Sequence, residues 1–224
     1  MFAAALGLLV AATPSIDVAF GQLCDAQLAP REFCETFTTC AAGKKSACAG
    51  DNHKTVQADE DWSEWSCDID RKNGFLECKV KTHLTTGPGA GDIFEAHWQA
   101  ALFVSKGRIT VGLSTRGDRP QTAFFSPEGQ GWSKVDPLPK LTPATFGLKE
   151  PRPPKKNVSR FEYQPEFFLE LDLPRDGTTI SVEGRWVNTA RDDSGYGQSD
   201  TQLSSASRLL DWNATIGKFS VNRQ

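Results

Sequence analysis

Apolar and polar residues alternate with a period of two in several stretches of the chain after Trp62, as in β-strands with one buried face. The first pair of such stretches is separated by a four-residue loop that ends in Gly74. Antiparallel pairing around this loop puts Cys67 opposite Cys78, at a separation suited to a disulfide bond. We therefore predict a hairpin closed by Cys67–Cys78, with its apolar side chains on one face: Trp65, Ile69, Leu76 and Val80.

A second hairpin is predicted around Lys106-Gly107, a two-residue turn sequence. Pairing about this turn places Val104 opposite Ile109 and Leu102 opposite Val111. The register that fits the turn thus also aligns the apolar residues, and this agreement supports the hairpin.

A third hairpin is predicted with a turn at Pro174-Arg-Asp-Gly177, which would put Leu171 opposite Ile180 and Leu169 opposite Val182. The stretch 127–156 is rich in proline, which excludes a central strand or a long helix, and is predicted to be a surface excursion. Farther along, residues 202–210 are expected to form a short helix and 214–221 a last strand.

Three hairpins with half-buried alternation predict a mainly β protein, an antiparallel β-sandwich or barrel of jelly-roll-like type. This β domain is expected to span residues 59–224. A small disulfide-rich N-terminal cap is expected over 22–58, with a short helix over 30–40 that has proline in its first turn.

The chain begins with an apolar stretch of the length found in secretory signal peptides, and too short to span a bilayer. We assign residues 1–21 to a signal peptide, with cleavage after Gly21; cleavage near Ala12 is the alternative. No later segment is apolar enough to cross a membrane, so the mature protein is expected to be secreted or periplasmic.

The six cysteines all lie in the first 78 residues, and an even number in an exported protein indicates three disulfide bonds. Apart from Cys67–Cys78, the sequence leaves three pairings open for the other four: Cys24, Cys34, Cys40 and Cys48. A zinc site is disfavoured because no CxxC spacing occurs. We expect no metal and no cofactor.

The charge balance argues against nucleic acid as a partner. The chain has 25 Lys and Arg against 28 Asp and Glu, a formal net charge of −3. General nucleic-acid binders are usually basic.

The polar side of the second hairpin carries the best candidate site. Glu95, His97 and Gln99 point the same way, and the register places Ser114 opposite Gln99 and Arg116 opposite His97. Asp118 would face Glu95. Arginine can clamp a carboxylate and histidine can move a proton near neutral pH. We predict a ligand-binding face, left open for recognition, formed by Glu95, His97, Gln99 and Arg116; an ordinary solvated sheet face is the alternative.

The stretch Glu95-Ala-His97-Trp-Gln99 resembles the concanavalin-like polysaccharide lyases, which carry a Gln-x-His strand on a concave sheet. Here Glu95 stands where that family has the glutamine. The resemblance implies that His97 would neutralise or deprotonate a uronic acid, with Arg116 on its carboxylate.

We therefore rank a secreted or periplasmic module that binds a glycan or a protein partner first, with no catalytic residue. A lyase-like carbohydrate-active enzyme is the alternative, with His97 and Arg116 as its catalytic residues. A structural surface or assembly component, in which the Pro-rich excursion serves as an interaction arm, is the third hypothesis.

Overall fold

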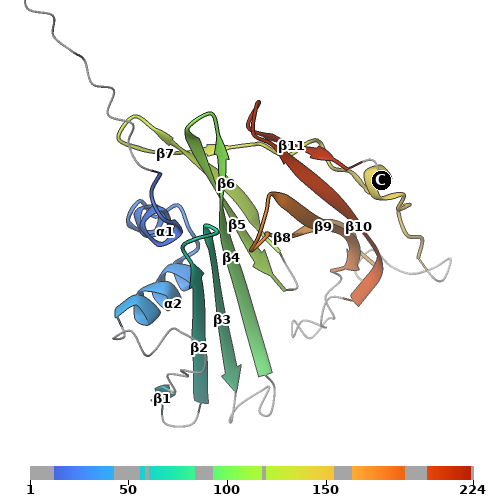
Figure 1. Ribbon diagram of the computed structural model, residues 1–224. Coiled ribbons are helices and arrows are strands. Elements are labelled where there is room, and N and C mark those ends of the chain that lie inside the picture. The colour runs from blue at the N-terminus through green and yellow to red at the C-terminus, as the bar shows by residue number, and fades with distance from the viewer. Residues whose placement is uncertain are drawn as a thin grey trace, which may run out of the picture.

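The computed structural model describes residues 13–42, 56–58, 61–83, 93–117, 120–153, 163–189 and 201–222. Within these residues the chain forms two antiparallel β-sheets and two α-helices (Figure 1). The mainly β, antiparallel fold class predicted from the sequence is confirmed.

The larger sheet is a meander in which each strand pairs with the next one in the sequence. Short turns that the structure describes connect β2 to β3, β4 to β5 and β6 to β7. Its seven strands are β1 (Val56–Ala58), β2 (Asp61–Asp70), β3 (Phe75–His83), β4 (Ile93–Ser105), β5 (Arg108–Arg116), β6 (Thr122–Glu128) and β7 (Gly131–Val135).

The smaller sheet has four strands in the order β11-β10-β9-β8. β8 is therefore an edge strand, and the sheet's other edge is β11. The bounds are β8 (Pro165–Asp172), β9 (Thr179–Asn188), β10 (Thr201–Asn213) and β11 (Lys218–Val221).

The first two predicted hairpins are present in the predicted registers. Cys67 lies opposite Cys78 in β2–β3, and Val104 lies opposite Ile109 in β4–β5. Gly74 has a φ of 68°, and Gly107 has a φ of 76°. Both values lie in the left-handed region that favours glycine, which is why these residues end their turns.

The third hairpin forms, but the predicted register was wrong by two residues. Leu171 lies opposite Val182, where Ile180 had been expected. The loop between the strands is longer than a four-residue turn, because β8 ends at Asp172 and β9 begins at Thr179. A shift of two keeps every side chain on its predicted face.

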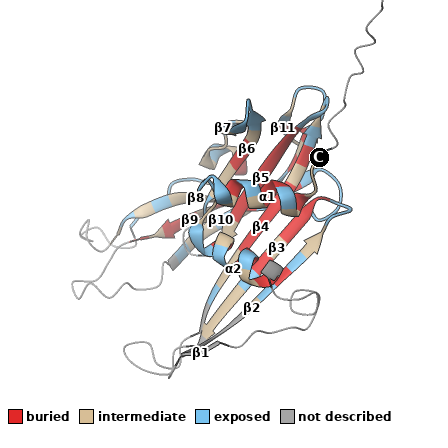
Figure 2. Cartoon of the chain, turned by 90° about the vertical axis from the view of Figure 1, so that its left-hand side faces the viewer, coloured by how far each residue is buried: buried red, intermediate tan, exposed pale blue. Residues whose placement is uncertain are grey.

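Two helices cover one face of the large sheet: α1 (Ile16–Asp25) and α2 (Arg31–Ala42). Figure 2 looks onto this face, where the helices lie across β2, β3 and β4. The rings of Phe20 and Phe33 are 4.2 Å apart, and Phe33 stacks on Trp98 at 5.8 Å. The predicted helix over 30–40 is thus confirmed, and the N-terminal cap shares its core with the sheet.

The two sheets enclose a second core, which contains Phe103, Phe124, Leu171 and Trp212. The Pro-rich excursion contributes to it, because Phe146 of the short 3-10 helix η1 (Pro143–Phe146) is only 3% exposed. As predicted, the described part of this excursion contains no central strand and no long helix, and its first part forms the edge strand β7. The excursion is not confined to the surface, however, because its apolar side chains pack inward: Leu138, Leu141, Phe146 and Leu148.

The helix expected over 202–210 is also wrong, since these residues belong to β10, which pairs with β9. A register irregularity lies between Gln202 and Ser204. Leu203 is the additional residue of this bulge and falls out of the period of two, so the spacing Leu203, Ala206, Leu210 imitated a helix. The last strand is shorter than expected, because residues 214–217 form the preceding turn.

Two disulfide bonds join described cysteines. Cys67–Cys78 is the predicted bond, and Cys24–Cys34 ties α1 to α2. Cys48 lies outside the described residues. Among the helices that the structure describes, none is both long and apolar enough to span a bilayer.

Candidate functional site

The edge of β8 rests on the inner face of the large sheet, and side chains of that face satisfy its backbone. The Ser114 hydroxyl donates a hydrogen bond of 2.6 Å to the Leu171 carbonyl oxygen. The Leu173 amide donates to Gln99 Oε1 at 2.9 Å. Ser114 and Gln99 thus provide hydrogen-bond partners to backbone groups at this edge, as a neighbouring strand would.

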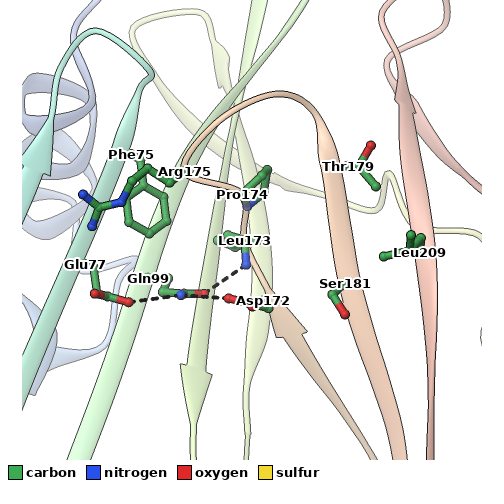
Figure 3. A pocket seen from close by; sticks show the side chains of 10 residues that line it. All are labelled: Phe75, Glu77, Gln99, Asp172, Leu173, Pro174, Arg175, Thr179, Ser181 and Leu209. Atoms are coloured by element: carbon green, nitrogen blue, oxygen red, sulfur yellow. Dashed lines mark hydrogen bonds between the residues drawn. The ribbon is translucent and has the colours of Figure 1, made fainter.

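Beside this junction, residues of both sheets line a pocket of about 340 Å³. In Figure 3, Glu77 and Gln99 lie on one side, while Asp172 and Ser181 lie on the other. Gln99 forms the floor of the pocket and links its two carboxylates. Its Nε2 donates to Asp172 Oδ1 at 3.0 Å and to Glu77 Oε1 at 3.3 Å. The remaining lining residues are Phe75, Leu173, Pro174, Arg175, Thr179 and Leu209.

Glu77 accepts from three side chains on the large sheet. His97 Nε2 lies 2.6 Å from its Oε1, and Lys79 Nζ lies 3.0 Å from its Oε2. Burial alone would raise the pKa of Glu77, but the hydrogen bonds from Lys79, His97 and Gln99 outweigh it and lower the pKa to about 2. Glu77 is therefore a carboxylate at neutral pH.

Arginines bridge the sheets on both sides of this floor. Arg116 of β5 is ion-paired with Asp172 of β8. At the turn between β8 and β9, Arg175 reaches Asp68 of β2 at 2.5 Å and lies 5.1 Å from the centre of the Phe75 ring. The Arg175 side chain thus spans from one sheet to the other at the Phe75 end of the pocket.

Three of the four predicted ligand-binding residues come together at this junction. His97, Gln99 and Arg116 belong to one polar network, and His97 lies opposite Arg116 as predicted. Glu95 lies apart, is mostly exposed and pairs with Lys81 at 3.3 Å. Asp118 lies outside the described residues.

The expectation that this polar face is left open was wrong for two of its residues. Gln99 is 4% exposed and Ser114 is 1% exposed, because the edge of β8 covers them. The Ser114 hydroxyl and Gln99 Oε1 bind backbone groups of the small sheet, and Gln99 Nε2 binds the carboxylates of Asp172 and Glu77. The pocket beside the junction stays accessible.

Sequence reasoning missed the pocket residues Glu77, Asp172, Arg175 and Ser181. Glu77 lies opposite Gln99 in the β3–β4 pair. That pair could have been inferred by continuing the meander from the first hairpin to the second. Asp172, Arg175 and Ser181 come from the other sheet, and no local pattern indicates how two sheets dock.

The lyase-like arrangement implied by the resemblance is only partly present. His97 has a carboxylate partner in Glu77, which could orient its ring. Arg116, however, already binds Asp172, and its Nε lies 3.8 Å from Glu170 Oε1. An arginine held by two acidic side chains is poorly placed to receive the carboxylate of a uronic acid.

Comparison of the chain with models of protein families, with curated proteins and with solved structures gave no match.

Proposed function

We propose that this protein is an exported binding module and that the pocket between its two sheets receives a glycan. The observation that carries the proposal is the pocket itself, with Glu77 and Gln99 facing Asp172 and Ser181. Small-ligand sites are concave and combine apolar lining with a few convergent polar groups. A volume of about 340 Å³ lies at the lower end of the range for such sites.

The lining chemistry favours hydroxyl groups as the recognised feature. Carboxylates accept hydrogen bonds from sugar hydroxyls, and a serine hydroxyl both donates and accepts. In the described part of the chain, the bonds to Asp172 go to Oδ1, and the Ser181 hydroxyl makes no hydrogen bond. Leu209 and Pro174 add apolar surface at the rim.

Export is the second part of the proposal. Two disulfide bonds are typical of proteins that fold in an oxidising compartment. Cleavage after Gly21 would cut α1 in two, whereas Ile16, Ala19 and Phe20 are fully buried. We therefore prefer the alternative of cleavage near Ala12, which keeps α1 whole.

A glycan array probed with the purified protein and two matched variants tests the binding role. Ser181→Trp fills the pocket, and Ser220→Trp makes the same change at an exposed position of β11 in the same sheet. We expect the wild type and Ser220→Trp to bind the same glycans, and Ser181→Trp to lose them. A signal that survives in Ser181→Trp would refute the pocket as the site. Binding to a protein partner alone would refute the glycan assignment.

A further inference from the structure

Resting on the proposed glycan-binding function, we propose further that the pocket selects an uncharged saccharide unit and rejects uronic acids and amino sugars. The reason is that the charged groups lining the pocket are already neutralised by partners within the protein. A neutral ligand can bind without disturbing these pairs.

On the large-sheet side of the pocket, the negative charge of Glu77 is neutralised by side chains of the same sheet. Glu77 contacts Lys79 at 3.0 Å and His97 at 2.6 Å, and its side chain is only 18% exposed. The carboxylate of a uronic acid placed here would meet the negative charge of Glu77. Lys79 has three donors and could reach this carboxylate while still bound to Glu77, but the two carboxylates would then lie close together and repel each other.

On the small-sheet side of the pocket, the charged side chains are likewise paired with opposite charges within the protein. Asp172 is paired with Arg116, and Arg175 is paired with Asp68 at 2.5 Å. An ammonium group on a ligand would be attracted to Asp172 but repelled by the two arginines. A hydroxyl group can instead share the Asp172 carboxylate while the arginine stays bound, because a carboxylate accepts several hydrogen bonds at once.

Ser181 supplies the uncharged contact that this selection requires. It lies directly opposite Asp172 in the β8–β9 pair, and both line the pocket. Its hydroxyl, which is free among the described residues, can donate to one sugar oxygen while Asp172 accepts from another. The two side chains thus offer an acceptor and a donor to neighbouring hydroxyl groups.

Titration calorimetry with three classes of hexasaccharide tests the selection. The probes are neutral hexamers of glucose and of mannose in several linkages, hexagalacturonate as the anionic class and the hexamer of glucosamine as the cationic class. We expect at least one neutral hexamer to bind at least about tenfold more tightly than either charged class. Hexagalacturonate binding as tightly as the best neutral hexamer would overturn the inference and leave the glycan-binding function standing.

Two variants test whether internal pairing is the cause. Asp172→Asn removes one of the two acidic charges that hold Arg116, and Glu77→Gln removes the charge that holds Lys79 and His97. Each is expected to gain affinity for hexagalacturonate, and a thermal melt establishes that each is folded. If both fold and neither gains affinity, charge pairing does not explain the selection and the inference fails. If no hexamer binds the wild type, and the array shows no glycan that Ser181→Trp loses, the proposed function fails as well.

Discussion

The hydroxyl of Ser114 in β5 donates a hydrogen bond of 2.6 Å to the carbonyl oxygen of Leu171 in β8, and so joins the two sheets. Both residues are buried, at 1% and 0% exposure. β8 is an edge strand, and a buried carbonyl without a partner is costly. A polar residue on the inner face of one sheet therefore stabilises the edge of the other.

Replacing Ser114 with alanine should lower the free energy of unfolding by about 1–2 kcal/mol, because the Leu171 carbonyl loses its side-chain donor in a dry site. Urea unfolding measures the change. Ser220→Ala, at an exposed position of β11, is the control and should change stability little. Equal losses in the two variants would mean that the Ser114 hydrogen bond does not stabilise the junction.

The acid stability of the protein should depend on Glu77. Its pKa is lowered to about 2 in the folded protein from an ordinary value of 4.5, so its stabilising contribution is complete above pH 4.5. As the pH falls from 4.5 towards 2, the unfolded state takes up the proton more readily and this contribution is lost. A pKa shift of this size corresponds to a contribution of roughly 3 kcal/mol at most to the free energy of unfolding.

Urea unfolding at pH 7 and pH 3 checks this dependence. Glu77→Gln should be less stable than the wild type at pH 7 and should lose less stability between the two pH values. Glu95→Gln is the control, since Glu95 is mostly exposed. An unchanged loss in Glu77→Gln would show that other carboxyl groups account for the acid sensitivity.

Local pairing was predictable where a turn sequence and an apolar alternation agreed. Lys106-Gly107 and Gly74 fixed two hairpins, and Cys67 opposite Cys78 followed from the register. Prediction failed where one extra residue broke the period, as at Leu203 in β10. It also failed where the loop length was misjudged, as between Asp172 and Thr179.

The candidate site was harder to predict, because half of it comes from contact between sheets. The alternation did identify His97, Gln99 and Arg116 as neighbours on one polar face. That face also receives Asp172, which comes from the other sheet. A polar residue that hydrogen-bonds the edge of another sheet and a polar residue that binds a ligand both produce the same alternation in the sequence. The pattern alone therefore does not distinguish the two roles.

Removal of residues 1–21 should destabilise the protein far more than removal of residues 1–12. The longer deletion removes Ile16, Ala19 and Phe20, which are fully buried, and the Asp17 carboxylate that pairs with Arg71 at 2.8 Å. Losing a buried phenylalanine side chain alone costs about 3–5 kcal/mol. Thermal melts of the two truncated chains check the stability, and the intact mass of the protein expressed with its full leader in a secretion-competent host checks the cleavage site. A processed chain that begins at Gln22 and is equally stable would contradict the prediction.

Gly184 in β9 should not tolerate a side chain, because the excursion packs directly on its backbone. A Cβ atom placed there would lie 2.8 Å from ring atoms of both Phe146 and Phe167. Real Cβ atoms essentially never approach other atoms so closely, so both rings would have to move within a packed core. Gly184→Ala should therefore lower the free energy of unfolding by about 1–3 kcal/mol. Gly131→Ala in β7 is the matched control, since the nearest atom to its Cβ would be the Glu128 carbonyl oxygen at 3.9 Å. A Gly184→Ala protein as stable as Gly131→Ala in chemical denaturation would show that the Pro-rich excursion does not depend on this contact to hold its place on the small sheet.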